Sequence, residues 1–411
     1  MTIALLFATL LASSAGDLAG PWRAVLSSPG GELPFTLRVD ATPDGPRAVI
    51  LNASEEAPVS SVARDGARVV FRFEGYDSEI AATLSPDGRR LAGEWTRTGA
   101  GGAKSRLAFE AWKGDTRRFG PAKGGPLEAN SLDPAGAWAV EFVDETGESP
   151  ARAEFRRDGK RLLGTFLTPT GDYRFLEGDF EDGRLRLSTF DGAHAFLFTG
   201  TARKDGTLRG DFFSRDAYHA EWTARRLENA EVPDGRPDPF SMTGLASPDG
   251  RLRFAFPDLE GRVVTQDDPR LRGKALVVNV FGSWCPNCND EAPLLAAWRK
   301  KYAERGLEIV GLAFEMTGDA ARDREFVRRF AARHGIEYPL LLAGTSDKAA
   351  ASKALPDLTR VLAFPTTIFV GRDGRVRRIH TGFDGPATGA HHARLVAELE
   401  REVEGVLADR R

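Results

Sequence analysis

The feature that most constrains this chain is a Cys-X-X-Cys motif built from Cys285 and Cys288, the only two cysteines in the sequence. The motif follows an apolar, β-branched run at residues 275–281 and precedes a stretch at 290–305 with helical spacing. Two thiols three positions apart in the first turn of a helix can reach each other, and the helix N-terminus favours a thiolate at the first of them. The arrangement therefore predicts dithiol redox chemistry at a strand-to-helix junction.

The composition describes an ordinary folded protein of several domains. The chain has 411 residues, of which 41% are hydrophobic and 28% charged, and its formal net charge is −3. About two to four domains are expected at this length. A net charge this small gives no electrostatic reason to expect nucleic acid or an anionic membrane surface as a partner. Because both cysteines lie in one motif, the other domains must rely on their hydrophobic cores.

Residues 1–16 have the pattern of a secretory signal peptide, in which an apolar run is followed by small residues. The pattern lacks a Lys or Arg before the apolar run, so an internal strand is the alternative. The run is roughly ten residues long, and no other stretch approaches ~18 apolar residues, so no transmembrane segment is predicted. We expect an exported protein of the periplasm or cell envelope.

The chain repeats itself once before the cysteine motif. Gly20-Pro21-Trp22 recurs as Gly136-Ala137-Trp138, and three other landmarks recur at a similar offset of about 117 residues. These are Asp65-Gly66 with Asp182-Gly183, Asp87-Gly88 with Asp205-Gly206, and Gly93-Glu94-Trp95 with Gly210-Asp211-Phe212. A nearly constant offset predicts a duplicated module of ~100 residues, and two copies fit paired domains better than a solenoid.

Each copy has the alternation of antiparallel β-structure, for example at residues 68–73 and 184–190. Strand signals recur about every ten residues, which favours a meander, a sandwich or a barrel. Asp-Gly turns are predicted at Asp65, Asp87, Asp158, Asp182 and Asp205. Five tryptophans at alternating positions are interpreted as core residues: Trp22, Trp95, Trp112, Trp138 and Trp222.

After about residue 250 the pattern changes to strands that alternate with amphipathic helices, which predicts an α/β fold with mostly parallel strands. A helix is expected at 323–334, and the last helix places Leu395, Leu399, Val403 and Val406 on one face. The expected organisation is a signal peptide at 1–16, β module 1 at 17–118, a linker at 119–132, β module 2 at 133–228, a linker at 229–249 and an α/β domain at 250–411.

The C-terminal part, from about residue 252 onward, resembles the TlpA/ResA group of thioredoxin-fold thiol-disulfide oxidoreductases. The matching stretches are 254–262, 271–293, 309–315 and 364–374, in the order and spacing of the family. The resemblance does not extend to the β modules. It implies a multidomain protein in which two all-β antiparallel modules, produced by duplication, are followed by an α/β thioredoxin-fold domain.

The resemblance also implies roles for the residues around the motif. Cys285 is the attacking thiolate and Cys288 the resolving thiol. Pro365 matches the cis-proline of the family, and Phe364 before it offers its backbone to an extended partner segment. Glu315 matches a buried acidic residue that takes the proton of Cys288, for which burial must raise its pKa. A solvent-exposed glutamate at a strand end is the alternative for Glu315.

Further positions match the family around this core of the site. Trp284, Phe364 and Thr366 are expected to contact the partner, although plain core packing explains Trp284 equally well. Asn279 stands where ordinary thioredoxins carry a buried aspartate. Glu291 and Pro293 also match, and we interpret them as structural: Glu291 at the start of the helix and Pro293 as a kink.

Other chemistries fit the sequence less well. A peroxiredoxin needs Thr or Ser three residues before its reactive cysteine, and Gly282 stands there. A copper chaperone needs a longer cysteine spacing and a distal histidine, for which His380 is the candidate on a core strand. His391 and His392 begin the last helix and are interpreted as solvated. A structural zinc site needs four ligands, so we predict no metal and no cofactor.

The expected function is exchange of the dithiol with a client protein that carries a disulfide or a cysteine pair. Reduction of the client is favoured by analogy with the family, in which a membrane electron donor recharges the dithiol. The alternative is a partner-binding or copper-chaperone-like protein, in which the β modules bind and the redox domain is secondary.

Overall fold

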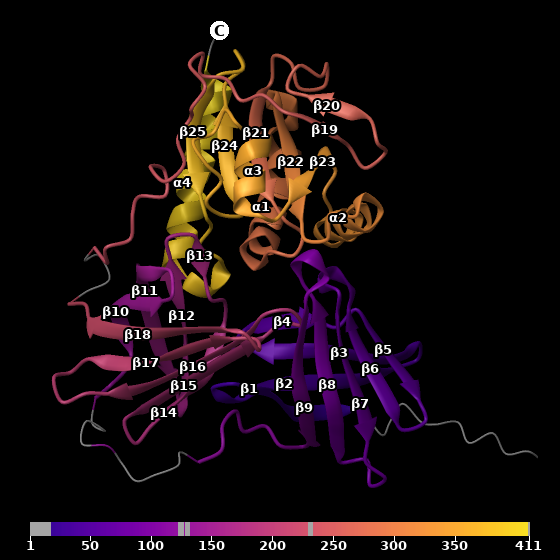
Figure 1. Cartoon of the computed structure of the whole chain (residues 1–411), viewed down its shortest axis with the longest axis vertical. Coiled ribbons are helices and arrows are strands. Elements are labelled where there is room, and N and C mark those ends of the chain that lie inside the picture. The colour runs from indigo at the N-terminus through magenta and orange to yellow at the C-terminus, as the bar shows by residue number, and fades with distance from the viewer. Residues whose placement is uncertain (1–17, 122–126, 128–131, 229–232, 410–411) are drawn as a thin grey trace, which may run out of the picture.

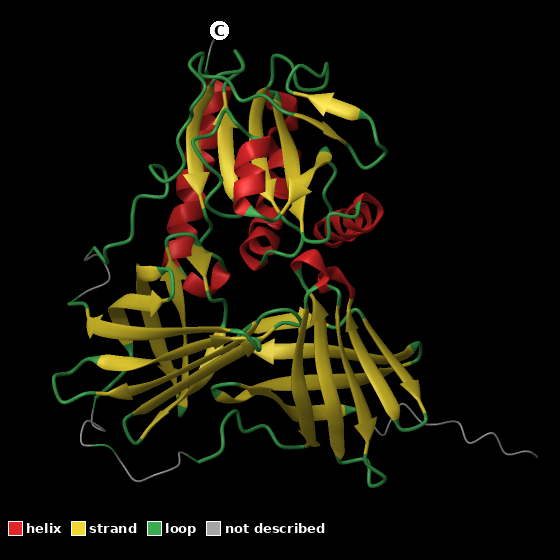
Figure 2. Ribbon diagram, viewed as in Figure 1, coloured by secondary structure: helices red, strands yellow, loops and turns green. Residues whose placement is uncertain are grey.

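The computed structural model describes residues 18–121, 127, 132–228 and 233–409, which form two β modules and one α/β domain (Figure 1). The expected signal peptide at 1–16 lies outside the described residues, as do parts of both expected linkers. The two β modules lie side by side, and the α/β domain lies across both of them (Figure 2). Among the helices that the structure describes, none combines the length and apolar character needed to cross a bilayer.

β module 1 is one antiparallel sheet with the strand order β4-β3-β2-β1-β9-β8-β7-β6-β5. Its strands are β1 (Gly20–Ser28), β2 (Gly31–Thr42), β3 (Gly45–Asn52), β4 (Glu55–Pro58), β5 (Ser61–Asp65), β6 (Arg68–Phe73), β7 (Ser78–Leu84), β8 (Arg90–Thr98) and β9 (Lys104–Lys113). Short 3-10 turns follow β6 at Glu74–Tyr76 and β8 at Ala100–Gly102. The sheet curls so that β3 contacts β5 near its two ends.

β module 2 repeats this order and closes on itself, because β10 pairs with β18, β11 pairs with β12, and β12 pairs with β14. Its strands are β10 (Gly136–Asp144), β11 (Gly147–Asp158), β12 (Arg161–Thr168), β13 (Gly171–Asp172), β14 (Leu176–Glu181), β15 (Arg184–Phe190), β16 (Ala195–Ala202), β17 (Leu208–Ser214) and β18 (Tyr218–Arg226). The two-residue strand β13 folds back on the end of β12 and forms a hairpin outside the closed ring.

Matching contacts in the two modules confirm the duplication. Trp22 Nε1 donates to Leu18 O, and Trp138 Nε1 donates to Pro134 O, each at 2.9 Å and each four residues back along the chain. A cation from the last strand covers each of these rings: Lys113 lies over Trp22 and Arg226 over Trp138. Four of the five tryptophans are fully buried, as predicted, and Trp112 is half-buried beneath the Arg23 guanidinium.

The predicted Asp-Gly turns are confirmed between β5 and β6, β7 and β8, β11 and β12, β14 and β15, and β16 and β17. At the fourth of them both Asp182 and Gly183 have positive φ, 53° and 78°. A tight hairpin of the I′ type requires this backbone, which Asp-Gly tolerates better than other pairs. The turn chemistry therefore fixes where the strands end.

The two modules meet at a shared cluster of buried side chains, and β module 2 also keeps a core cluster of its own. The Phe190 ring of β15 packs against three rings of module 1, with centroid distances of 4.6 Å to Phe35, 5.7 Å to Trp95 and 5.8 Å to Phe73. Asn52 Nδ2 donates to Phe190 O at 2.7 Å across the same contact. Aromatic packing of this extent, together with the Asn52 hydrogen bond, holds the two modules against each other.

The α/β domain is built on a five-stranded sheet with the order β23-β22-β21-β24-β25. Its elements are β19 (Ala255–Pro257), β20 (Val263–Thr265), β21 (Ala275–Phe281), α1 (Pro286–Tyr302), β22 (Leu307–Glu315), α2 (Ala320–His334), β23 (Leu340–Thr345), α3 (Lys348–Ala354), β24 (Thr366–Val370), β25 (Val376–Thr381) and α4 (Ala390–Ala408). β21, β22 and β23 are parallel, whereas β24 and β25 run antiparallel to their neighbours. The sheet is therefore mixed rather than mostly parallel.

The helices of this domain follow the predicted apolar faces. In α4, Leu395, Leu399, Val403 and Val406 are all buried, as predicted. Helix α2 begins at Ala320, earlier than predicted, because the Asp319 carboxylate accepts hydrogen bonds from two backbone N–H groups of its first turn. The strands β21 and β22 end on the side of the sheet that faces the β modules (Figure 1). This places whatever follows β21, including both cysteines, at the boundary between domains.

Candidate active site

The Cys-X-X-Cys motif lies where β21 gives way to α1. Cys285 is the N-cap of α1, and its Sγ accepts a hydrogen bond from Cys288 N at 3.3 Å. The same sulfur lies 3.2 Å from Phe364 O, to which the thiol donates. Both cysteines are free thiols. A sulfur that caps a helix N-terminus is held where unpaired N–H groups stabilise negative charge, which is the environment predicted for a nucleophilic thiolate.

The loop before β24 supplies the opposite wall of the site. The Phe364–Pro365 peptide bond is cis, as predicted. The Phe364 ring packs edge-on to Trp284, with a centroid distance of 5.7 Å, and Trp284 Nε1 donates to Phe314 O at 2.9 Å. Trp284 is half-buried, so it both packs against the motif and keeps part of its surface open.

The Thr366 side chain does not face a partner, contrary to the role expected for it. Thr366 is fully buried, and its hydroxyl donates to Ala363 O at 2.9 Å. This hydrogen bond closes the turn at Pro365 from the inside. Thr366 therefore supports the loop, and of the three residues expected to contact a partner only Trp284 keeps a half-buried side chain, since Phe364 is buried as well.

The second thiol is held in its protonated form. Cys288 is 2% exposed, and its pKa is raised well above the usual value. Burial is the main cause, followed by the hydrogen bond and the charge of Cys285 and by the negative charge of Glu291. A thiol in this state becomes a nucleophile only when a nearby base removes its proton.

Two buried carboxyls flank the motif. Glu315 is 2% exposed, which excludes the alternative of a solvent-exposed strand end, and accepts hydrogen bonds from Ser283 N at 2.8 Å and Ser283 Oγ at 2.7 Å. Burial raises the pKa of Glu315 to about 7 against the opposing effect of these bonds. Glu315 therefore holds the segment that leads into the motif.

Glu291, which the sequence suggested was structural, is a buried carboxyl whose negative charge adds to the raised pKa of Cys288, after burial and the effects of Cys285. It is 1% exposed and accepts hydrogen bonds from Asn279 Nδ2 at 2.7 Å and Thr367 Oγ1 at 2.6 Å. Burial raises its pKa to about 7. Its position three residues after Cys288 places both on one face of α1, a signal that was present in the sequence. Asn279, at the position of the usual buried aspartate, holds this carboxyl in place.

Comparison with known proteins finds relatives of the region that carries the motif. Residues 229–394 match the Redoxin family model. The C-terminal region is a Redoxin domain. Over 131 residues the chain is 29% identical to the thiol-disulfide oxidoreductase ResA of Halalkalibacterium halodurans, which covers 32% of this chain and 66% of that relative. The ResA protein of Bacillus subtilis is 26% identical over 129 residues, covering 31% and 64%. The resemblance found in the sequence is thereby confirmed.

A thiol:disulfide interchange protein of the thioredoxin family from Chlorobium tepidum is similar in structure, with 24% identity and a TM-score of 0.30, covering 43% of this chain and all of that one. A thiol-disulfide oxidoreductase from Bacteroides fragilis has 20% identity and a TM-score of 0.27, covering 35% and 96%. The chain spans no more than about two thirds of the length of the curated relatives named above.

The β modules contribute side chains to the site that the sequence did not reveal. Asp172 of β13 accepts a hydrogen bond from Asn287 Nδ2, inside the motif, at 3.0 Å. Arg174 Nη1 donates to Asp290 of α1 at 2.9 Å and lies 3.4 Å from Pro286 O. No pattern of spacing links residues this far apart in the chain, so only the structure places them together.

The histidines of the Redoxin domain have other partners. His391, interpreted as solvated, instead lies against β module 2, where its Nε2 is 2.7 Å from the Glu154 carboxylate. His380 is buried and packs edge-on to Phe240. In the part of the chain that the structure describes, no three His, Cys, Asp or Glu side chains are grouped to hold a metal ion.

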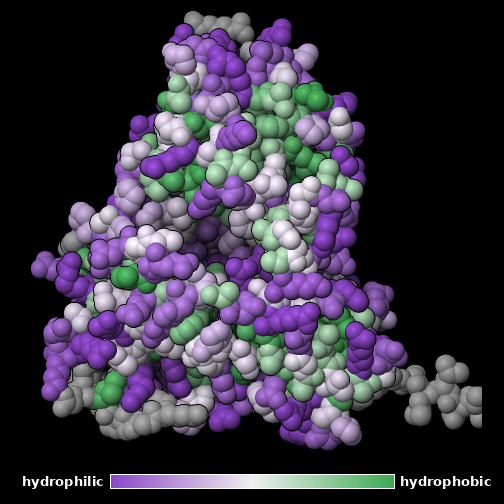
Figure 3. Space-filling view, in the orientation of Figure 1, coloured by the Kyte–Doolittle hydropathy of each residue, from purple (hydrophilic) through white to green (hydrophobic). Residues whose placement is uncertain are grey.

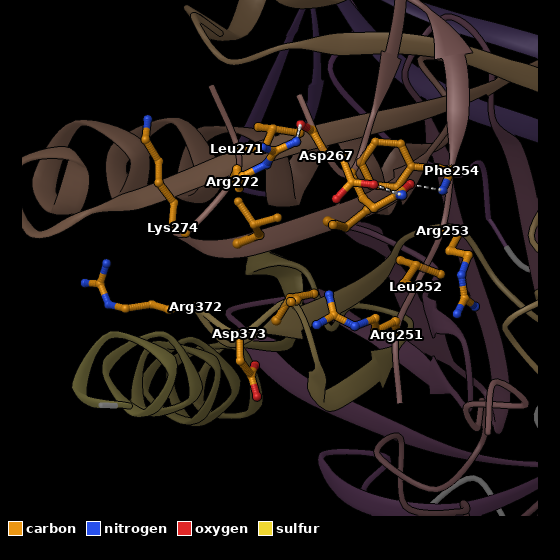
Figure 4. Close-up of a pocket in the computed structure, with 16 residues that line it drawn as sticks. Arg251, Leu252, Arg253, Phe254, Asp267, Leu271, Arg272, Lys274, Arg372 and Asp373 are labelled. Atoms are coloured by element: carbon orange, nitrogen blue, oxygen red, sulfur yellow. Dashed lines mark hydrogen bonds between the residues drawn. The ribbon is translucent and has the colours of Figure 1, made fainter. Parts of the chain in front are cut away.

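A hollow of about 450 Å³ lies at the other end of the Redoxin sheet, where β21 begins (Figure 4). Basic side chains surround it, among them Arg251, Arg253, Arg272, Lys274 and Arg372. Neither cysteine lines it. The redox site is thus marked by the geometry of the motif rather than by the size of a cavity.

The raised pKa values of Glu291 and Glu315 predict that the Redoxin domain loses stability as the pH rises. Both carboxyls have a pKa of about 7 in the folded chain against a usual value of 4.5, so the folded state keeps their protons longer. Their stabilising effect is complete below about pH 4.5 and is lost as the pH rises toward 7, at a cost of up to about 3 kcal/mol for each group.

Urea unfolding at about pH 5 and about pH 8 measures this effect. Glu291→Gln, which keeps the shape and cannot ionise, is expected to lose less stability between the two conditions than the natural chain. Equal losses in both proteins would show that Glu291 ionises as readily in the folded chain as in the unfolded one.

Proposed function

We propose that this protein is a thiol-disulfide oxidoreductase that exchanges the Cys285–Cys288 dithiol with the disulfide of a client protein. The observation that carries the proposal is the position of Cys285 Sγ, between Cys288 N at 3.3 Å and Phe364 O at 3.2 Å beside a cis-proline. The names of the ResA relatives agree with this reaction.

The reaction has two exchange steps. The Cys285 thiolate attacks one sulfur of the client disulfide, so that a mixed disulfide forms and the other client sulfur leaves as a thiolate that takes up a proton. The Cys288 thiol then loses its proton and attacks Cys285 Sγ, which releases the first client sulfur as a second thiolate. Two electrons and two protons pass from the dithiol to the client, and the protein is left with a Cys285–Cys288 disulfide.

Glu291 is our proposed acceptor for the proton of Cys288. Its negative charge already acts on that thiol, and its pKa of about 7 suits a group that takes and returns a proton near neutral pH. Glu315, which the resemblance to the family assigns to this role, is bonded through both oxygens to Ser283. The matched variants Glu291→Gln and Glu315→Gln distinguish the two carboxyls.

Reduction of the client is the proposed direction, and an exported location in the periplasm or cell envelope is the proposed setting. Both follow from the resemblance to the TlpA/ResA group and from the pattern at residues 1–16. In that setting a membrane electron donor would recharge the dithiol. The surfaces of Trp284 and Phe364 would contact the client segment that carries the disulfide.

Trapping with Cys288→Ser tests the exchange reaction. This variant keeps the attacking thiol and lacks the resolving one, so it is expected to accumulate mixed disulfides through Cys285 when expressed in the native envelope. Mass spectrometry of the trapped species, released by a reductant, identifies the clients. The double variant Cys285→Ser, Cys288→Ser is the matched control, and equal recovery of proteins with both variants would reject the reaction.

A further inference from the structure

In this structure the redox motif faces the chain's own β modules. The strands that lead into the site end toward the modules, and Cys285 is only 3% exposed (Figure 1). Disulfide exchange requires the attacking sulfur to meet a client sulfur directly, so its rate depends on access. A sulfur this deeply buried meets the disulfide of a folded protein only after groups around it have moved.

The part of the modules that lies against the motif is the hairpin at residues 168–174, which joins β12 to β13. One oxygen of Asp172 accepts two hydrogen bonds, from Asn287 Nδ2 at 3.0 Å and from Gly385 N at 2.6 Å. Asn287 belongs to the motif, and Gly385 belongs to the segment after β25. A single carboxyl of β module 2 therefore ties together two separate segments of the Redoxin domain.

The hairpin fits the motif closely enough to exclude another chain. A methyl group on Gly171 would lie 2.4 Å from Asn287 Oδ1, and one on Gly382 would lie 2.8 Å from the Thr170 carbonyl. Both glycines have positive φ, 155° and 85°, which other residues rarely adopt. A client segment can approach this side of the motif only after the hairpin has left it.

Arg174 is the charged centre of the contact. It is buried, and its guanidinium meets carboxylates from three parts of the chain: Asp290 of α1, Glu55 of β module 1 and Asp191 of β module 2. A buried ion pair needs good geometry, because removing both charges from water costs free energy that offsets much of their attraction. Separation of the Redoxin domain returns Asp290 to water, so the contact opposes opening without making it irreversible.

Two other ion pairs across the boundary are more exposed. Arg322 pairs with Asp77, and Arg329 pairs with Glu74, with all four side chains at least about one third exposed. Exposed ion pairs of this kind contribute little. Mainly hydrophilic side chains lie along the boundary on the face drawn in Figure 3. The hairpin contact is thus more buried than these two ion pairs, and it is the contact that touches the motif itself.

We propose that the 168–174 hairpin competes with the client for the same face of the Redoxin domain, and that Arg174 and Asp290 form the latch of this closed state. The inference rests on the proposed exchange reaction. In the closed state the modules cover the Cys285 thiol, and a client protein reaches it when the Redoxin domain moves away from the hairpin. Small disulfides and small thiol reagents are less affected by the cover than proteins are.

The test compares small and bulky thiol reagents on the full chain in a Cys288→Ser background, where Cys285 is the single thiol. The rates of Cys285 modification by iodoacetamide and by a maleimide on a long polyethylene glycol chain are measured. Arg174→Met and Asp290→Ala are each expected to raise the bulky-to-small rate ratio by about tenfold, which corresponds to 1.4 kcal/mol in the closing equilibrium. Asp290 lies on the Redoxin side of the contact, so Asp290→Ala keeps the test valid where Arg174→Met disturbs β module 2.

Arg186→Met is the matched control, because Arg186 is a partly buried arginine of β module 2 that pairs with Asp179 and Glu181 and not with the Redoxin domain. An unchanged bulky-to-small rate ratio in both latch variants would contradict the proposal that the hairpin limits access to Cys285. Slower modification by both reagents in these variants would also contradict the proposal, because the hairpin contact would then promote the reaction of Cys285. A failure of the proposed exchange reaction would give a different result. Maleimide would then modify Cys285, yet Cys285 would form no mixed disulfide with any protein in any variant.

Discussion

Cys285→Ser is expected to reduce insulin disulfides no faster than buffer with the same thiol reductant. The hydroxyl of serine stays protonated at the helix N-terminus, whereas the thiol that it replaces forms the nucleophile. The remaining thiol, Cys288, cannot substitute for it because it is buried and its pKa is raised well above the usual value. Turbidity of reduced insulin, followed over time with a small-molecule reductant, measures the loss.

Cys288→Ser serves as the comparison, because it also removes one thiol from the same motif. It is expected to lose turnover as well, yet to keep the first step, seen as one equivalent of a chromogenic thiol released from an aromatic disulfide. Cys285→Ser should release none. If Cys285→Ser still released one equivalent of the chromogenic thiol and Cys288→Ser released none, the roles of the two cysteines would be reversed.

Glu291→Gln is expected to slow resolution of the mixed disulfide by roughly a hundredfold at neutral pH, the usual size of a general-base effect. In the natural chain the rate of resolution should rise with pH through about 7, because the carboxylate form of Glu291 is the one that accepts a proton. The variant should lose this inflection and keep only the slower rise that follows direct ionisation of Cys288. Stopped-flow measurement of the second thiol released, over a range of pH, records both effects.

Glu315→Gln is the matched control for this prediction. It makes the same chemical change at another buried carboxyl, one with a similar pKa of about 7 and bonds to Ser283. We expect the inflection near pH 7 to remain in Glu315→Gln. The opposite outcome, in which Glu315→Gln removes the inflection and Glu291→Gln keeps it, would return the proton-accepting role to Glu315, as the family resemblance first suggested.

Much of the fold could be predicted because its signals are local. The Asp-Gly turns, the alternation in the β modules and the apolar face of α4 each depend on residues within a few positions of one another. The motif could be predicted in the same way. Placing one cysteine at an N-cap and the other one turn later requires only that the following residues form a helix. The cis bond at Pro365 and the burial of Glu315 came from resemblance to a family.

The remainder of the site depends on contacts between distant parts of the chain. Glu291 was present at helical spacing from Cys288, but its importance becomes visible only with Asn279 and Thr367 on their strands, where they donate hydrogen bonds to its carboxyl and orient it. Asp172 and Arg174 had no signal at all, because an ordinary turn sequence gives no indication of the surface that it will meet. Thr366 was misread because a strand position alone does not tell which face is inward.

The ring cluster around Phe190 has a consequence for how this protein arose and how it unfolds. Two modules produced by duplication would at first have folded separately, each around its own core. Here Phe190 of the second copy has become part of the first copy's interior, together with the Asn52 contact to its backbone. Neither copy can now lose its structure without exposing aromatic surface of the other, so the pair is expected to melt in one cooperative transition.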